Sequence, residues 1–291
     1  MSQSPISRRE LLARTGLATA AFGLSRSLEP LFADAKTRGF KIGICEWMLG
    51  RPDQASLDVA KEIGVDGMQA NMGNLKNDMQ LRKPEVQRAY VEAAKKLGLE
   101  ISSIGVAEMN NTPLKSDPVA EPWLLESIQV AKALGVKVIL LAFFYKNDLK
   151  NDKPGTDRVV ELLKKAAPVA EKEGVIYGIE SWLSADEHLD IINRVGSPAL
   201  TCYYDVGNSH KMGYDIYKEI RQLGRQICEF HAKDYDNIYG TGQVDFRRVR
   251  EAMDEIGYRG WIQIESGSKL GPIPSFKANR AYLKEVFPAT V

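Results

Sequence analysis

The stretch ELLKKAAPVAEKEGVIYGIE, residues 161–180, contains the unit that decides the fold. Residues 161–173 space their apolar side chains at the period of an amphipathic helix. Gly174 follows, where a helix commonly ends in the left-handed backbone conformation that glycine adopts freely. Residues 175–179 form a short apolar run typical of a buried parallel strand, and Glu180 closes it. The stretch is therefore predicted to form a helix, a glycine turn and a strand.

The same unit repeats from Phe40 to the C-terminus. Its strands are predicted at 40–46, 66–70, 99–105, 136–142, 175–180, 199–204, 227–231 and 261–265. A glycine precedes each strand: Gly39, Gly64, Gly98, Gly135, Gly174, Gly196, Gly224 and Gly257. Helices are expected between the strands, for example over 84–96 and 246–256. Eight such units in about 250 residues predict a single-domain (β/α)₈ TIM barrel over residues 36–291. The alternative, a doubly wound open sheet, usually has a glycine-rich nucleotide loop after its first strand, and none follows Glu46.

Composition and charge narrow the class of protein. The chain has 291 residues, of which 44% are hydrophobic and 26% charged, as in an ordinary soluble globular protein. A net charge of +1, without a basic run interleaved with aromatic residues, predicts neither a nucleic-acid partner nor a membrane surface. Three cysteines, all in predicted strands, indicate buried thiols and no disulfide framework. The sequence leaves a monomer and a homo-oligomer both open.

The first 35 residues differ from the rest. Ser7-Arg8-Arg9 precedes a weakly apolar, uncharged run, and Ala33-Asp34-Ala35 offers a small-x-small cleavage site. The paired arginines resemble a twin-arginine signal, which predicts a bacterial protein exported to the periplasm after folding. The alternative is an ordinary amphipathic N-terminal helix. No other segment is long and apolar enough to predict a membrane span.

Four polar residues each stand at the end of a predicted strand: Glu180, Asp205, His231 and Glu265. Because the carboxyl ends of barrel strands share one face, these side chains are expected to meet at one mouth. Three carboxylates and one imidazole suit a divalent metal ion, with Mn²⁺ expected first and Mg²⁺, Co²⁺ or Zn²⁺ as alternatives. A buried carboxylate without a partner is unfavourable, which also favours a bound cation. Asp205 could instead cap the next helix, and His231 could be a core histidine.

The sequence around these four residues resembles a known superfamily. Gly178-Ile179-Glu180-Ser181, Tyr204-Asp205-Val206-Gly207-Asn208, Phe230-His231-Ala232-Lys233-Asp234 and Gln263-Ile264-Glu265 are similar to the ligand motifs of the xylose-isomerase-like barrels. That group includes sugar phosphate isomerases/epimerases, ketose 3-epimerases, hydroxypyruvate isomerases and inosose dehydratases. The resemblance covers the chain from about Phe40 onward. It is specific for the fold and for a bound metal, but not for the substrate. It implies that Glu180 and Glu265 are both metal ligands and acid/base groups, acting beside a carbonyl through an enediolate.

Six further side chains are candidates for binding the substrate: Glu46, Trp47, Glu108, Asn208, His210 and Lys233. Lys233 matches a frequent lysine of the superfamily, although a surface lysine is an alternative. Asn208 occupies a slot where many relatives carry a histidine, so its role could have moved to His210 or be shared with it. Trp47 could stack on the apolar face of a sugar or belong to the core. His188 is predicted to begin a helix and not to bind metal.

The function expected from these features is a metal-dependent isomerase or epimerase of a small carbohydrate or keto sugar. The alternative is a lyase or hydrolase of keto-glycosides or inososes, because the same charge stabilisation beside a leaving group gives β-elimination. A non-catalytic sugar-binding barrel is the third reading, and the intact set of ligand residues argues against it. The superfamily's apurinic endonucleases use three zinc ions and many histidines, whereas this chain has three histidines.

Overall fold

The computed structural model describes residues 39–267 and 270–289, and its strands form a closed parallel barrel. The strands follow one another around the ring in sequence order, and β8 pairs with β1 through Lys41 and Trp261. Their bounds are β1 Lys41–Cys45, β2 Gly67–Asn71, β3 Glu100–Val106, β4 Val138–Phe143, β5 Ile176–Ser181, β6 Leu200–Asp205, β7 Ile227–Ala232 and β8 Trp261–Ile264. The predicted TIM barrel is confirmed. The export signal predicted over residues 1–35 lies outside the described residues.

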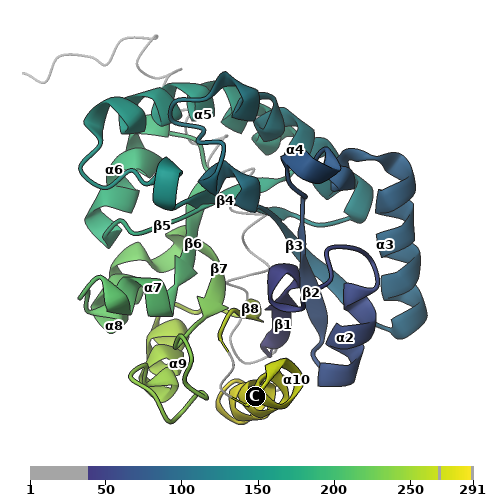
Figure 1. Ribbon diagram of the computed structural model, residues 1–291. Helices are drawn as coiled ribbons and strands as arrows, with labels where there is room; N and C mark the ends of the chain where they lie inside the picture. Colours follow the sequence, from purple (N-terminus) through teal and green to yellow (C-terminus); the bar gives the residue numbers. More distant parts are fainter. Residues whose placement is uncertain (1–38, 268–269, 290–291) are drawn as a thin grey trace, which may run out of the picture.

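Helices surround this ring of strands (Figure 1). They are α2 Ser56–Ile63, α3 Pro84–Leu97, α4 Pro122–Leu134, α5 Lys153–Glu173, α6 Ala185–Val195, α7 Val206–Lys211, α8 Ile216–Leu223, α9 Phe246–Glu255 and α10 Pro272–Val286. Helix α5 begins well before the predicted residue 161, because the Asp152 side chain caps it by accepting from the Gly155 N–H. Within the described residues, no helix combines the length and the apolar character needed to cross a bilayer.

The glycines end the helices as the sequence predicts. Gly174 has a φ of 68° and its N–H bonds to the Ala170 carbonyl, which stops α5 before β5. Four other helices end in the same left-handed conformation, at Gly64, Gly98, Gly135 and Gly196. Gly224 departs from the pattern. Its ψ of −124° lies outside the left-handed helical region, and a 3₁₀ helix begins at this residue.

A polar layer fills the barrel interior beside the predicted metal ligands. Its centre is Glu229, a buried carboxylate on β7. Glu229 accepts hydrogen bonds from Gln263 Nε2 at 2.6 Å and from Tyr203 Oη and Ser103 Oγ at 2.9 Å. Burial raises the pKa of Glu229 to about 7 despite these donors. The Tyr203 ring lies 4.5 Å from the His231 ring, so this layer supports the centre described below.

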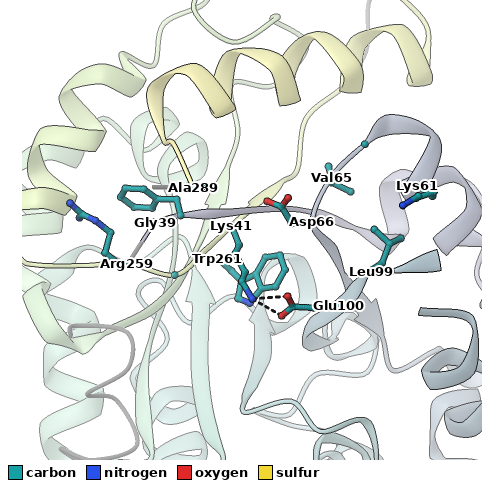
Figure 2. Close-up of a pocket in the computed structure, with 14 residues that line it drawn as sticks. Gly39, Lys41, Lys61, Val65, Asp66, Leu99, Glu100, Arg259, Trp261 and Ala289 are labelled. Atoms are coloured by element: carbon teal, nitrogen blue, oxygen red, sulfur yellow. Dashed lines mark hydrogen bonds and ion pairs between the residues drawn. The ribbon is translucent and has the colours of Figure 1, made fainter. Parts of the chain in front are cut away.

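A cavity of about 880 Å³ opens at the opposite end of the barrel, where the strands begin (Figure 2). Its acids are already paired: Lys41 Nζ lies 2.7 Å from Glu100 Oε1, and Lys284 bonds to Asp66. The N-terminal end of a TIM barrel usually serves stability, while the C-terminal end carries chemistry. Function is therefore expected at the other mouth, although its cavity is smaller.

Candidate metal centre and sugar site

The four predicted ligands meet at the C-terminal mouth of the barrel. Each offers one ligand atom, and these atoms lie within 4.8 Å of one another. Glu180 is on β5, Asp205 ends β6, His231 is on β7 and Glu265 directly follows β8. Strand register explains the convergence, because Asp205 and His231 are direct partners across β6 and β7. The predicted grouping of these four side chains is therefore seen in the structure.

Asp205 shows that this set suits a cation. Its Oδ1 accepts from the N–H groups of Gly207 and Asn208, both at 2.8 Å, and so caps α7 as the alternative reading expected. Its Oδ2 is buried and has no hydrogen-bond partner among the described residues, although Lys233 Nζ lies 3.4 Å away. Burial and the neighbouring acids raise the pKa of Asp205 to about 8. An unpartnered carboxylate oxygen facing two further carboxylates and an imidazole fits a divalent ion.

The His231 ring is held from both sides. Its Nδ1 lies 2.9 Å from Glu180 Oε1 and 3.5 Å from Glu265 Oε2, on the side of the ligand set. Its Nε2 lies 2.8 Å from Oε1 of Gln69, a fully buried residue of β2. An amide oxygen only accepts, so Nε2 donates to Gln69; Nδ1 would bind a divalent ion through its lone pair once the proton that it shares with Glu180 is displaced. Sequence reasoning missed Gln69, although a glutamine within the apolar strand predicted at 66–70 was a usable signal.

Two candidate substrate residues instead contact an acid of the centre. Lys233 Nζ lies 2.7 Å from Glu265 Oε2, and Trp47 Nε1 donates to Glu265 Oε1 at 2.8 Å. Burial opposes ionisation of Glu265, but Lys233 and His231 outweigh it and lower its pKa to about 2. Glu265 is therefore held as an oriented carboxylate.

Of the remaining substrate candidates, Asn208 lies in the cavity and His210 lies outside it. Asn208 lines the same cavity as Glu180 and Glu265, and its Oδ1 accepts from Tyr235 Oη at 3.2 Å. His210 is on the neighbouring surface, 3.2 Å from Gln243, and does not line this cavity.

The two other acids do not line the cavity. Glu46 is buried against the Asn71 N–H, which donates at 2.6 Å, and the Tyr90 hydroxyl. The chain turns into a 3₁₀ helix at Glu46, so this side chain does not continue the direction of β1. Glu108 accepts from Asn111 Nδ2 at 3.2 Å, while its neighbours Ala107 and Asn110 line the cavity. As predicted, His188 lies in the first turns of α6, and it contacts Ser181.

The cavity above the centre holds about 260 Å³ and has an aromatic wall. Phe144 and Tyr145 follow β4, and Trp182 follows β5. Their rings form edge-to-face pairs, with centroids 5.3 Å apart for Phe144 and Trp182 and 5.5 Å apart for Tyr145 and Trp182. Sequence reasoning missed all three, although each lies just beyond the end of a predicted strand.

Comparison with known proteins agrees with this geometry. Residues 57–286 match the sequence profile of the xylose isomerase-like TIM barrel. The chain belongs to this family. It is 25% identical over 223 residues to 2-epi-5-epi-valiolone 7-phosphate 2-epimerase of Actinoplanes sp., which covers 73% of this chain and 82% of the relative. It is 26% identical over 245 residues to L-ribulose-5-phosphate 3-epimerase UlaE of Escherichia coli, covering 77% and 86%.

Solved structures of sugar epimerases share the fold. An L-ribulose 3-epimerase superposes with a TM-score of 0.71 at 19% identity, covering 85% of this chain and 94% of the other. D-allulose 3-epimerase from Methylomonas sp., in complex with D-allulose, gives a TM-score of 0.68 at 17% identity, covering 85% and 97%. The named relatives are thus sugar epimerases, two with phosphorylated and two with unphosphorylated sugars in their names.

Proposed function

We propose that this protein is a divalent-metal-dependent isomerase or epimerase that acts on a sugar at the carbon beside a carbonyl. One observation carries the proposal: two glutamates, an aspartate and a histidine converge within 4.8 Å at the catalytic mouth of a TIM barrel. The kinship with sugar epimerases supports it. Mn²⁺ is the proposed ion, held by Glu180, Asp205, His231 and Glu265.

The bound ion would supply Lewis-acid polarisation of the substrate's carbonyl and adjacent hydroxyl oxygens. The protein residues supply proton transfer. Lys233 and Trp47 keep Glu265 ionised and oriented, so it is ready to take a proton from carbon. Glu180, 2.9 Å from His231 Nδ1, would enter the step protonated and deliver its own proton to the opposite face. Removing a proton from one face and delivering another to the opposite face inverts the centre, and exchange with solvent then resets the two carboxylates. Delivery to the former carbonyl carbon, with the hydroxyl proton passing to the former carbonyl oxygen, moves the carbonyl instead.

Solvent exchange tests this proposal. The Mn²⁺-loaded protein is incubated in D₂O with L-ribulose, D-allulose and their terminal phosphate esters, and deuterium beside the carbonyl is followed by NMR. We expect exchange with the carbon skeleton retained in the wild type, and losses of at least about 100-fold in Glu180→Gln and Glu265→Gln, as for a general acid/base residue. Release of water or an alcohol would indicate the lyase instead. Full exchange in both variants would exclude the two-glutamate mechanism.

We also propose that residues 1–35 direct this enzyme to the periplasm through the twin-arginine pathway. Arg8, Arg9 and the small-x-small site at Ala33-Asp34-Ala35 support the proposal. Export of a folded chain suits a protein that binds its metal before it crosses the membrane.

A further inference from the structure

Phe144 and Trp182 of the aromatic wall pack in a hydrophobic cluster, whereas Tyr145 has no evident structural role. Tyr145 is 74% exposed, yet it lines the cavity that contains Glu180 and Glu265. Its φ of 52° places a bulky side chain in the left-handed region, which such residues rarely adopt. Strained residues of this kind cluster at ligand sites, where the surrounding structure imposes them. Because the ring is mostly exposed, its burial contributes little to the stability of the fold.

The loop that carries Tyr145 is fixed by hydrogen bonds on either side of it. The Phe144 N–H donates to Asn110 Oδ1 at 3.0 Å. Two residues beyond Tyr145, the buried Asn147 donates from Nδ2 to the Ala142 carbonyl at 2.8 Å. Trp182 packs edge-on against both Phe144 and Tyr145. The wall is therefore already assembled at the side of the cavity.

The charges around the cavity are already matched. Among the described residues that line it, Lys233 is the only lysine or arginine. Lys233 is committed to Glu265 at 2.7 Å and to Asp205 at 3.4 Å. The three carboxylates of the centre balance this lysine together with a divalent ion, so no surplus positive charge is left for a phosphate dianion. Lys150 reaches the Trp182 carbonyl only through the Tyr214 hydroxyl and is paired with Glu187 at 2.7 Å.

We propose, on the basis of the function above, that the site takes a neutral, unphosphorylated keto sugar whose C–H face packs against Tyr145 and Trp182. The apolar face of a sugar ring presents C–H groups that are attracted to the electron-rich face of an aromatic ring. A cavity of about 260 Å³, slightly below the usual range for small-molecule sites, suits one sugar unit. The wall, and the lack of a free cation among the described residues that line the cavity, together select against a phosphate ester.

Calorimetric titration tests this inference directly. The Glu180→Gln protein, which is expected not to turn over, is kept at a Mn²⁺ concentration that fills its weakened metal site by metal analysis, and is titrated with L-ribulose and L-ribulose 5-phosphate, and with D-allulose and its 6-phosphate. We expect each neutral sugar to bind at least about tenfold more tightly than its ester. In the same background, Tyr145→Ala and Trp182→Ala should each weaken binding of the neutral sugar by about 2- to 12-fold, the range of a single aromatic contact.

Two controls separate binding from folding. Tyr145→Gly, whose backbone adopts the left-handed conformation freely, should keep the wild-type melting temperature and still lose affinity. Leu125→Ala, which removes an exposed apolar side chain of α4 outside the cavity lining, should bind like the parent.

The results separate this inference from the function on which it rests. Tighter binding of the esters, binding of neither member of a pair, or unchanged affinity in both wall variants would overturn the inference. Solvent exchange that favours the esters would also overturn it and leave the epimerase proposal standing. Wall-dependent binding of neutral sugars without any exchange in the unsubstituted protein would support the inference and contradict the epimerase.

Discussion

Gln69 provides a sharp test of how the centre is oriented. Replacing it by methionine keeps the size of the side chain and removes the oxygen that accepts from His231 Nε2 at 2.8 Å. Both residues are fully buried, so the Nε2–H keeps only the weak acceptor Cys45 Sγ at 3.4 Å. An unsatisfied buried donor is unfavourable by about 1–3 kcal/mol. This corresponds to roughly a 5- to 150-fold loss of affinity, and outer-shell substitutions at metal sites usually fall at about 10- to 100-fold.

The assay is competition for Mn²⁺ between the protein and a chelator of known affinity, so it needs no substrate. We expect Gln69→Met to lower Mn²⁺ affinity about 10- to 100-fold. Gln69→Glu keeps an accepting oxygen and should remain within a few-fold of the wild type. The matched control is Gln263→Met, because Gln263 is also buried but donates to Glu229 and not to a ligand. It should lower the melting temperature and leave Mn²⁺ affinity unchanged. Wild-type affinity in Gln69→Met would refute the proposed role of this hydrogen bond.

Two further predictions concern stability and export. Burial raises the pKa of Glu46 to about 7 from a usual 4.5, despite the donors Asn71 and Tyr90. Between these two pH values the folded protein keeps a proton that the unfolded chain releases. The free energy of unfolding therefore falls as the pH rises from 4.5 to 7. Urea unfolding should show that this group lowers the free energy of unfolding by about 3 kcal/mol between pH 4.5 and 7. The Glu46→Gln variant should lack this loss. An equal dependence of stability on pH in the two proteins would contradict the assignment. Joint replacement of Arg8 and Arg9 by lysine should retain the full-length precursor in the cytoplasm on cell fractionation; unchanged periplasmic recovery would exclude the twin-arginine route.

The barrel and the quartet could be predicted because both depend on strand order. A glycine before most of the apolar runs marks where a helix ends, and parallel strands bring their carboxyl ends to one mouth. A residue that closes a strand, such as Glu180 or Asp205, therefore has a fixed place before any contact is known. Alternation along a strand likewise determines which side chains enter the barrel, so Gln69 was within reach of the same reasoning.

The loops could not be predicted in this way. Glu46 follows a strand just as Glu265 does, but the 3₁₀ turn that begins there directs its carboxylate towards Asn71. His210 belongs to α7, and its direction depends on helix geometry that the motif does not contain. Tyr145 lines the cavity with a backbone φ of 52°. The local sequence gives no reason to expect this left-handed conformation for a tyrosine.

The central claim is that Glu180, Asp205, His231 and Glu265 bind a single divalent ion. The most direct measurement is the metal content of the purified chain after equilibration with Mn²⁺ and removal of free metal. We predict one ion per chain for the wild type and almost none for the double variant Asp205→Asn/His231→Gln, with both proteins folded by circular dichroism. Equal metal content in the two proteins, or none in the wild type, would contradict the account.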